Sequence, residues 1–351
     1  MKDVVIVAEK SLMGFCRTIF HTLGMPDEDA AYAAECIVKT NMWGVDSHGV
    51  IRMPIYAERL HNGAVNPVPN VSTVREFGSL AQMDGDNGLG YVVARKAMDK
   101  AISLAARHGV GSVAVRNSNH FGAAAIFVRQ AAAAGMIGIA MADTLPNMVG
   151  PGSRVPAVGN NPIAFGAPFF GERPFVFDLS LSQVAGGKLL MAKEKGEKIP
   201  LDWAVDVNGN PTNDPVAGFA GSFLPVGGHK GYGLALVVEL LSGLLSGGMF
   251  LGGVKSMHKE PEEPSRTSHH MMAINPAALM DKEEWAARMR TLRDELKAVP
   301  MREGASSLVF PGELEDACET ARMAEGIPLP LSVRDDLLKT AARFAPQAKL
   351  S

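Results

Sequence analysis

The sequence predicts an α/β fold in which helices pack on a sheet, and three observations support this prediction. Helical and extended patterns alternate between residues 91 and 142, as they do where helices cover a sheet. Helical patterns also occupy residues 12–43 and 281–344. At 351 residues, the chain exceeds the size at which a single hydrophobic core usually stops growing, so we expect two domains or one large α/β unit.

The first predicted elements are two helices. Apolar residues at helical spacing form one stripe: Leu12, Phe15, Cys16, Ile19, Phe20 and Leu23. Ser11 is expected to cap the start of this helix, and Gly24 ends it. A second helix begins after Pro26 and runs to Trp43. The two helices deliver the chain to a polar stretch at residues 46–52.

Helices and strands alternate in the next part of the chain. The patterns predict a glycine-rich turn, a helix, a strand, a helix and a strand, in the order 84–90, 91–108, 112–116, 121–134 and 137–142. Residues 109–114 match the G-x-G-x-x-G/A dinucleotide pattern. That motif must follow a strand and open a helix, whereas these glycines follow a helix and open a strand. We therefore interpret Gly109 as a helix cap.

The second half of the chain begins with a long loop over residues 143–162. Loops of this length inside compact domains are usually functional or disordered. The later elements are predicted as two short strands, two helices, a further strand and three helices: 163–165, 175–177, 182–195, 232–245, 271–275, 281–298, 314–325 and 332–344. Residues 252–268 contain charged residues and proline, so we expect this segment to be exposed.

Composition argues against several classes of protein. The net charge is −3 with no basic block, which gives no support to nucleic-acid binding. The apolar run near the N-terminus is too short for a signal peptide, and the best candidate membrane span, residues 231–250, is broken by Glu239 and several glycines. Three widely spaced cysteines without a C-x-x-C motif indicate buried thiols in a reducing cytosol, so a cytoplasmic protein is predicted: Cys16, Cys36 and Cys318.

The polar stretch at 46–52 is the strongest candidate for a functional site. His48 can exchange a proton, and Arg52 can hold a carboxylate. His48 is flanked by the Ser47 hydroxyl and by Gly49, which allows the backbone to approach a ligand closely. Pro54 is tolerated in the first turn of a helix. We therefore expect His48 just before a helix and Arg52 in its first turn, facing one pocket. The alternative is a lone histidine and a surface arginine at a helix start.

Two further positions are candidates for ligand contacts. His120 lies in a polar loop between a strand and a helix, where ligands gather in α/β sheets; the alternative is a structural loop histidine. Lys230 follows two glycines at a helix start and can meet a phosphate through its charge and the backbone amides, although the upstream glycine of a P-loop is missing. Four further histidines lack the spacing of metal ligands, so no metal site is predicted. We expect His258 to be solvated. Three histidines stay unassigned: His229, His269 and His270.

Together, these residues resemble the type-2 malate/L-lactate dehydrogenase family of NAD(P)-dependent oxidoreductases, which includes the sulfolactate dehydrogenases. The segments that support the resemblance span nearly the whole chain, and their order and spacing are specific jointly: 46–50 with Arg52, 117–122, 161–162, 178–180, 229–234 and 311–313. The resemblance implies a non-Rossmann mixed-sheet cofactor domain at 76–249 and a helical domain built from both chain ends, 1–75 and 250–351. It also implies a homodimer whose active site lies near the subunit interface.

The resemblance implies a role for each site residue. His48 resembles the proton donor/acceptor with Ser47 orienting it, His120 resembles the alternative acid/base, and Arg52 resembles the anchor of the substrate carboxylate. Asn160 stands at a substrate contact where many relatives have threonine. The residues that match dinucleotide-lining positions are His120, Phe121, Gly122, Thr144, Asp178, Leu179, Ser180, Lys230, Gly231, Gly312, Glu313 and Leu314.

The implied reaction is a reversible hydride transfer between NAD(P) and C2 of a small 2-hydroxy acid or its 2-oxo partner. Leu314 replaces an arginine that is common after Gly-Glu, and its loss favours NAD over NADP because a 2′-phosphate would be bound less well. An alternative is the reduction of a cyclic or N-alkyl imino acid. Lys188 counts against it, because it stands where such reductases have an aspartate. A second alternative is a non-catalytic binding protein that keeps the fold.

Overall fold

A seven-stranded mixed sheet forms the centre of the molecule in this computed structural model, which describes residues 4–305 and 307–350. The strands, in their order across the sheet, are β2 (Ser72–Phe77), β3 (Leu80–Asp84), β4 (Val110–Ser118), β12 (Thr267–Ile274), β5 (Ile137–Ala142), β8 (Ile163–Ala167) and β9 (Phe175–Leu179). Among the described neighbouring strands of this sheet, β3 and β4 are the only pair that is parallel, and every other pair is antiparallel. A doubly wound dinucleotide fold has a mostly parallel sheet, so the prediction of a non-Rossmann α/β fold is confirmed.

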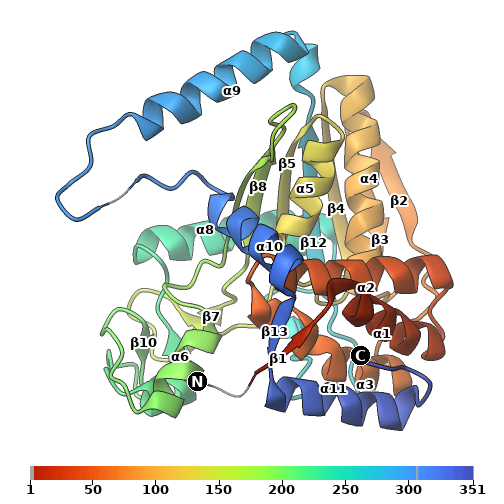
Figure 1. The fold of residues 1–351 in the computed structure, drawn as a ribbon, viewed down its shortest axis with the longest axis vertical. Coiled ribbons are helices and arrows are strands. Elements are labelled where there is room, and N and C mark those ends of the chain that lie inside the picture. The colour runs from red at the N-terminus through yellow and green to blue at the C-terminus, as the bar shows by residue number, and fades with distance from the viewer. Residues whose placement is uncertain (1–3, 306, 351) are drawn as a thin grey trace.

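Two helices cover one face of this sheet (Figure 1). α4 (Gly90–His108) packs on β4 and β12, and α5 (Ala125–Ala133) packs on β5 and β8. Gly109 follows α4 with a φ of +81° and ends the helix, which confirms its interpretation as a cap. α5 begins later than the sequence predicts, so the polar loop after β4 extends to Ala124. This longer loop contains His120.

A helical layer forms from both ends of the chain: α1 (Glu9–Thr22), α2 (Asp27–Met42), α3 (Met53–His61) and α11 (Leu331–Phe344). β1 (Val4–Val7) pairs antiparallel with β13 (Ile327–Pro330), so the N-terminal segment lies beside the C-terminal one. The predicted apolar stripe of α1 is buried from Leu12 to Phe20. The expected cap at Ser11 is wrong, because α1 begins at Glu9, directly after β1.

The C-terminal part of the chain contributes more to the large sheet than the sequence indicates. β12 lies between β4 and β5, although it belongs to the segment assigned to the helical domain. The division into 76–249 and the two chain ends stays a prediction, and the sheet crosses its boundary at residue 250. The expected exposure of 252–268 is wrong in part, because Val254, Ser256 and Ser265 are buried.

The loop after β5 is ordered by a small second sheet. Its strands, in order across the sheet, are β10 (Ala204–Val205), β11 (Ser222–Phe223), β6 (Met148–Val149) and β7 (Pro156–Val158). α6 (Gly186–Lys195) and α7 (Pro215–Ala220) contact each other, and α7 packs on β10 and β11. The long loop at 143–162 therefore has a fixed path beside the large sheet.

Two helices in the second half of the chain differ in how they pack against the rest of the molecule. α8 (His229–Glu239) continues into a π-helical turn at Leu240–Leu244 that packs on β4 and β12. α9 (Lys282–Lys297) projects from the body, and an extended segment leads from it to α10 (Glu313–Glu325) (Figure 1). Among the described helices, none has the length and apolar character needed to span a membrane.

Candidate active site

The polar turn that contains His48 is held in shape by Asn41 of α2. Two short 3-10 turns, Asp46–His48 and Val50–Arg52, lead into α3. Asn41 is only 2% exposed; its Oδ1 accepts the Val50 amide at 2.7 Å, and its Nδ2 donates to Asp46 at 2.7 Å. A Cβ at Gly49 would lie 2.1 Å from Asn41 Oδ1. Gly49 is therefore required by this contact, and the close approach to a ligand that the sequence suggested stays a prediction.

A residue from the other end of the chain fastens the same turn. Arg322 of α10 donates to both carboxylate oxygens of Asp46, at 2.6 and 3.0 Å. The Asp46 carboxylate thus lies between Asn41 and Arg322. Arg322 lies 276 residues after Asp46, so no local pattern indicates this contact.

The structure brings together the residues that the sequence singled out. Ser47 Oγ lies 2.9 Å from His48 Nδ1, and Arg52 Nε donates to the Ser47 carbonyl oxygen at 2.8 Å. His120 arrives from the loop between β4 and α5, and its ring stacks on that of His48 with centroids 5.6 Å apart and planes 20° apart. Two imidazoles and one guanidinium therefore share a single site, with Ser47 beside the first imidazole.

Tyr56 fixes the second imidazole. Its hydroxyl lies 2.6 Å from His120 Nδ1, and the Gly122 amide donates to the same nitrogen at 3.3 Å. Because an amide can only donate, this network assigns Nδ1 as the acceptor and places the proton on Nε2. Sequence analysis assigned no role to Tyr56. Its position four residues after Arg52, one helical turn further, was the available signal.

The surroundings of both histidines favour their uncharged forms. Burial and then the Arg52 guanidinium lower the pKa of His48 to about 4. Burial, followed by the neighbouring His48 and Arg52, lowers the pKa of His120 well below its usual value. Apart from burial, the side chains that lower the pKa of the two histidines are all basic. If Arg52 binds the carboxylate of an acid, a neutral imidazole beside the guanidinium can accept a proton from that molecule.

The residues that resemble a dinucleotide site gather around the end of β9. Asp178 Oδ2 accepts the Ala125 amide at 2.8 Å, which places it at the start of α5 and near the loop that contains Phe121. The Val176 amide donates to the Pro311 carbonyl at 3.3 Å, which brings the start of α10 to the same strand. Gly122 and Gly312 have φ values of +75° and +99°. Both glycines are buried, and a Cβ at Gly122 would lie 2.4 Å from the Tyr91 hydroxyl oxygen, so packing requires glycine there.

A second group of these residues continues from the first toward α8. Thr144 Oγ1 donates to Asn160 Oδ1 at 3.1 Å, and the Leu181 amide donates to the Asn160 carbonyl at 2.7 Å. The Leu181 carbonyl in turn accepts the Val226 amide, which leads to the start of α8. Here Lys230 is exposed beside the N-terminal amides of the helix. A cation at a helix N-terminus suits a phosphate, so the residues present fit a dinucleotide that runs along this edge.

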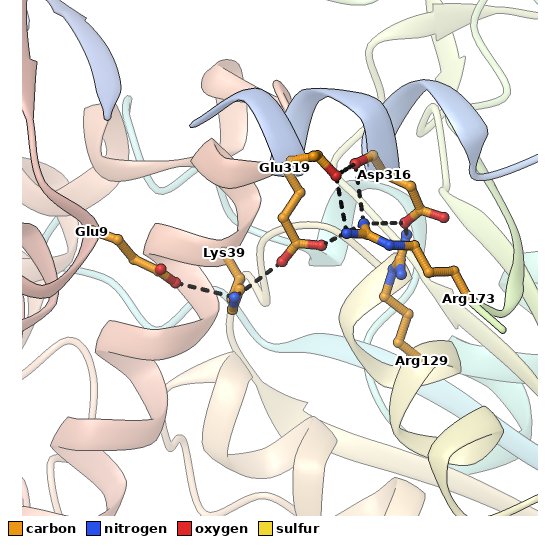
Figure 2. A network of polar contacts seen from close by, with 7 residues as sticks. Glu9, Lys39, Arg129, Arg173, Asp316 and Glu319 are labelled. Carbon is orange, nitrogen blue, oxygen red and sulfur yellow. Dashed lines mark hydrogen bonds and ion pairs between the residues drawn. The ribbon is translucent and has the colours of Figure 1, made fainter. Parts of the chain in front are cut away.

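The Glu313 carboxylate is already engaged within its own part of the chain. Glu313 Oε2 accepts the Phe310 amide at 2.9 Å and pairs with Lys297, and Leu314 is 65% exposed. α10 itself is anchored by a network of ion pairs (Figure 2). The pairs, with their N–O distances, are Asp316–Arg129 at 3.1 Å, Asp316–Arg173 at 3.2 Å, Glu319–Arg173 at 2.9 Å, Glu319–Lys39 at 3.0 Å and Lys39–Glu9 at 3.1 Å. Glu313 would therefore meet a cofactor through its backbone.

A cavity of about 460 Å³ opens beside the start of α8. It is lined by the loop at 149–154, by Asn208 and Gly209, and by Gly228 and His229. Its lining includes neither His48 nor Arg52. The cavity therefore extends the Lys230 end of the surface and is separate from the paired imidazoles.

The structure assigns the remaining histidines. His258 is accessible to solvent, as expected, and its Nε2 also accepts a hydrogen bond from Arg52 Nη1 at 2.8 Å. His269 is buried and bonds Ser118 Oγ at 2.7 Å, and His270 bonds the Leu241 carbonyl at 3.1 Å, so both are structural. His229 is exposed at the start of α8. Within 4–305 and 307–350, no group of His, Cys, Asp and Glu could hold a metal ion.

Comparisons with known proteins identify the family of this chain. The model of the malate/L-lactate dehydrogenase family matches residues 7–338. Malate dehydrogenase of Pyrococcus abyssi is 38% identical over 350 residues, covering 97% of this chain and 96% of its own length. The solved structure of sulfolactate dehydrogenase from Methanocaldococcus jannaschii has a TM-score of 0.91 at 37% identity and covers 97% of each chain. Other relatives are named as NAD⁺-dependent and as NADP⁺-dependent enzymes. The chain therefore belongs to the malate/L-lactate dehydrogenase family and is a nicotinamide-dependent dehydrogenase.

Proposed function

We propose that this protein oxidises a small 2-hydroxy acid to its 2-oxo acid, and catalyses the reverse reaction, with His48 as the proton acceptor and donor. The observation that supports this most directly is the stack of two neutral imidazoles beside Arg52. Oxidation of an alcohol requires removal of its proton, for which a neutral imidazole is suited. The carboxylate of a 2-hydroxy acid matches the guanidinium.

Arg52 would bind and orient the substrate. Its Nε donates to the Ser47 carbonyl oxygen, which restricts the plane of the guanidinium and would leave the Nη groups for the substrate. Two parallel hydrogen bonds to the carboxylate would then set which face of C2 is presented. Asn160 is less suited to a direct substrate contact through its Oδ1, because that atom accepts from Thr144 and Asn147.

The two imidazoles would have different tasks. His48 can donate from Nδ1 to Ser47 Oγ, which leaves the lone pair of its Nε2 for the substrate hydroxyl proton. His120 retains its proton on Nε2, because Tyr56 and Gly122 donate to its Nδ1. It can therefore donate a hydrogen bond to the substrate oxygen while His48 takes the proton. The alternative, in which His120 is the acid/base, requires the reverse tautomer.

The nicotinamide cofactor, when bound, accepts or supplies the hydride. We propose that Asp178, Leu179 and Ser180 with Phe121 and Gly122 hold one part of it. Thr144 and Lys230 with Gly231 would bind its phosphates, and the backbone of Gly312 and Glu313 would border its far end. The exposed Leu314 offers no charge to a 2′-phosphate, which favours NAD over NADP.

An assay of the purified protein with a panel of 2-oxo acids, each with NADH and with NADPH, tests this proposal. We expect loss of NADH absorbance with at least one 2-oxo acid, and less activity with NADPH. Addition of methylamine to pyruvate is the matched arm for imino-acid reduction, and we expect it to add nothing. Turnover only when the amine is present would replace the proposed function by the imine reductase. Absence of any nicotinamide oxidation would favour a binding protein.

We further propose that the protein is a homodimer. Apolar side chains lie exposed along α8 and its π-helical turn: Leu234, Val237, Leu240, Leu244 and Leu245. Patches of this kind mark protein interfaces, and a second copy of the chain can cover its own equivalent stripe across a twofold axis. The three free cysteines suit the reducing cytoplasm, which stays our prediction for its location.

Light scattering tests this assembly. We expect the mass of a dimer for the native chain and of a monomer for Leu240→Asp. Leu240 is 55% exposed in the single chain and would be buried in the dimer, where a carboxylate in its place would lose its hydration. Leu279→Asp is the matched control: this leucine is 83% exposed and lies away from the stripe. A dimer that survives Leu240→Asp, or a native monomer, would contradict the proposal.

A further inference from the structure

His258 accepts a hydrogen bond from the Arg52 guanidinium, the group that the substrate carboxylate would bind. Arg52 Nη1 donates to His258 Nε2 at 2.8 Å. Because a guanidinium only donates, His258 Nε2 accepts, so its ring is neutral and its proton lies on Nδ1. Burial, followed by the guanidiniums of Arg52 and Arg59, lowers the pKa of His258. A carboxylate that binds Arg52 therefore competes with His258 for Nη1. Its negative charge also offsets the positive charge of the guanidinium, which helps to lower the pKa of His258.

The loop around His258 is fastened to α3, the helix that directly follows Arg52. Arg59 is 2% exposed and donates from Nη2 to Ser265 Oγ at 3.0 Å. Asn62 donates to the Pro261 carbonyl at 3.2 Å. Within the loop, Ser256 Oγ accepts the His258 amide at 3.3 Å. These bonds fasten the loop beside α3 and so keep the His258 side chain within reach of Arg52.

The charged groups that face His258 favour an anion. They are the guanidiniums of Arg52, from the turn before α3, and of Arg59, from α3, while the neighbouring His120 is a base whose pKa is lowered in part by His258. Its own loop contains three acids, Glu260, Glu262 and Glu263, of which Glu260 is paired with Lys255 at 2.8 Å. When the carboxylate of a substrate binds Arg52, the His258 imidazole beside the guanidinium would thus be available to another group of the same substrate.

We propose that His258 is a specificity-determining residue that binds a second acidic group of the substrate. This inference rests on the proposed function. When the substrate carboxylate takes Nη1 of Arg52, His258 is released, accepts a proton from solvent and donates it in a hydrogen bond to an acid group beyond C2. The favoured substrates are therefore 2-hydroxy acids with a second carboxylate or a sulfonate, and monoacids lack this contact.

The ratio of kcat/KM for L-malate to that for L-lactate, measured in native protein and in His258→Gln, tests the inference. The Gln amide oxygen can still accept from Arg52, but the side chain cannot take up a proton. We expect kcat/KM for L-malate to fall by about tenfold to a hundredfold, the size of one charged hydrogen bond. We expect kcat/KM for L-lactate to change by less than about threefold, because Arg52, His48 and His120 are untouched.

Lys259→Gln is the matched control, because it removes a positive charge one residue further along the same loop. We expect the malate-to-lactate ratio to stay at the native value in this variant. An equal loss on both acids in His258→Gln, an unchanged ratio, or a native preference for lactate would overturn the inference while the dehydrogenase function stands. Absence of turnover by the native protein with any 2-hydroxy acid would overturn the proposed function itself, and this inference with it.

Discussion

His48→Ala is expected to lower kcat by about a hundredfold to ten-thousandfold, the usual contribution of general acid–base catalysis. The variant loses the imidazole that would take the substrate proton, while the surface around Asp178 and Lys230 stays intact. Binding of NADH, followed by its fluorescence, should therefore remain close to the native value. Steady-state kinetics with the best acid of the panel measures the first effect.

His120→Ala is the comparison variant, and pH dependence separates the two roles. A base with a pKa of about 4 is already deprotonated at neutral pH, so kcat/KM for oxidation should be flat above roughly pH 5. Reduction needs the protonated imidazole, so its kcat/KM should fall as the pH rises over the same range. We expect His120→Ala to retain more activity than His48→Ala. Full activity of His48→Ala would transfer the acid/base role to His120.

Arg52→Lys is expected to raise KM for every carboxylate substrate by about tenfold to a hundredfold. A lysine cannot reproduce two parallel hydrogen bonds to a carboxylate, and it cannot keep the bond to Ser47 while it also contacts His258. The affinity for NADH, measured by fluorescence titration, should change little. Arg290→Lys, the same change at an exposed position of α9, is the control. An unchanged KM for all carboxylates would end the anchor role.

The sequence predicts the parts of the site that depend on local spacing. Ser47, His48 and Arg52 lie within six residues, so the helix start alone brings them near each other. The loop position of His120 between a strand and a helix also follows from the pattern. What brings its ring onto His48 is the packing of the large sheet against the helical layer. The stacking distance therefore could not be predicted from either segment alone.

The parts that sequence analysis missed all depend on contacts between distant segments. His258 and Arg52 are 206 residues apart, and the charge and proline around His258 resemble those of any solvated loop. β12 was predicted only from residue 271, because its first residues, Thr267 to His270, are polar side chains that pair within the structure. Polar residues buried by specific bonds have no periodic pattern, so sequence hydropathy places them outside the core.

The pairing of β1 with β13 and of Asp46 with Arg322 has a consequence for the order in which the molecule is made. On the ribosome, the first segments emerge long before their partners near residue 322 have been translated. The nascent chain can collapse around its large sheet only after residue 274 appears, since β12 lies inside that sheet. The turn that holds His48 must then wait for the final helices. A truncated product would hold every residue proposed for proton transfer and still lack the means to align them.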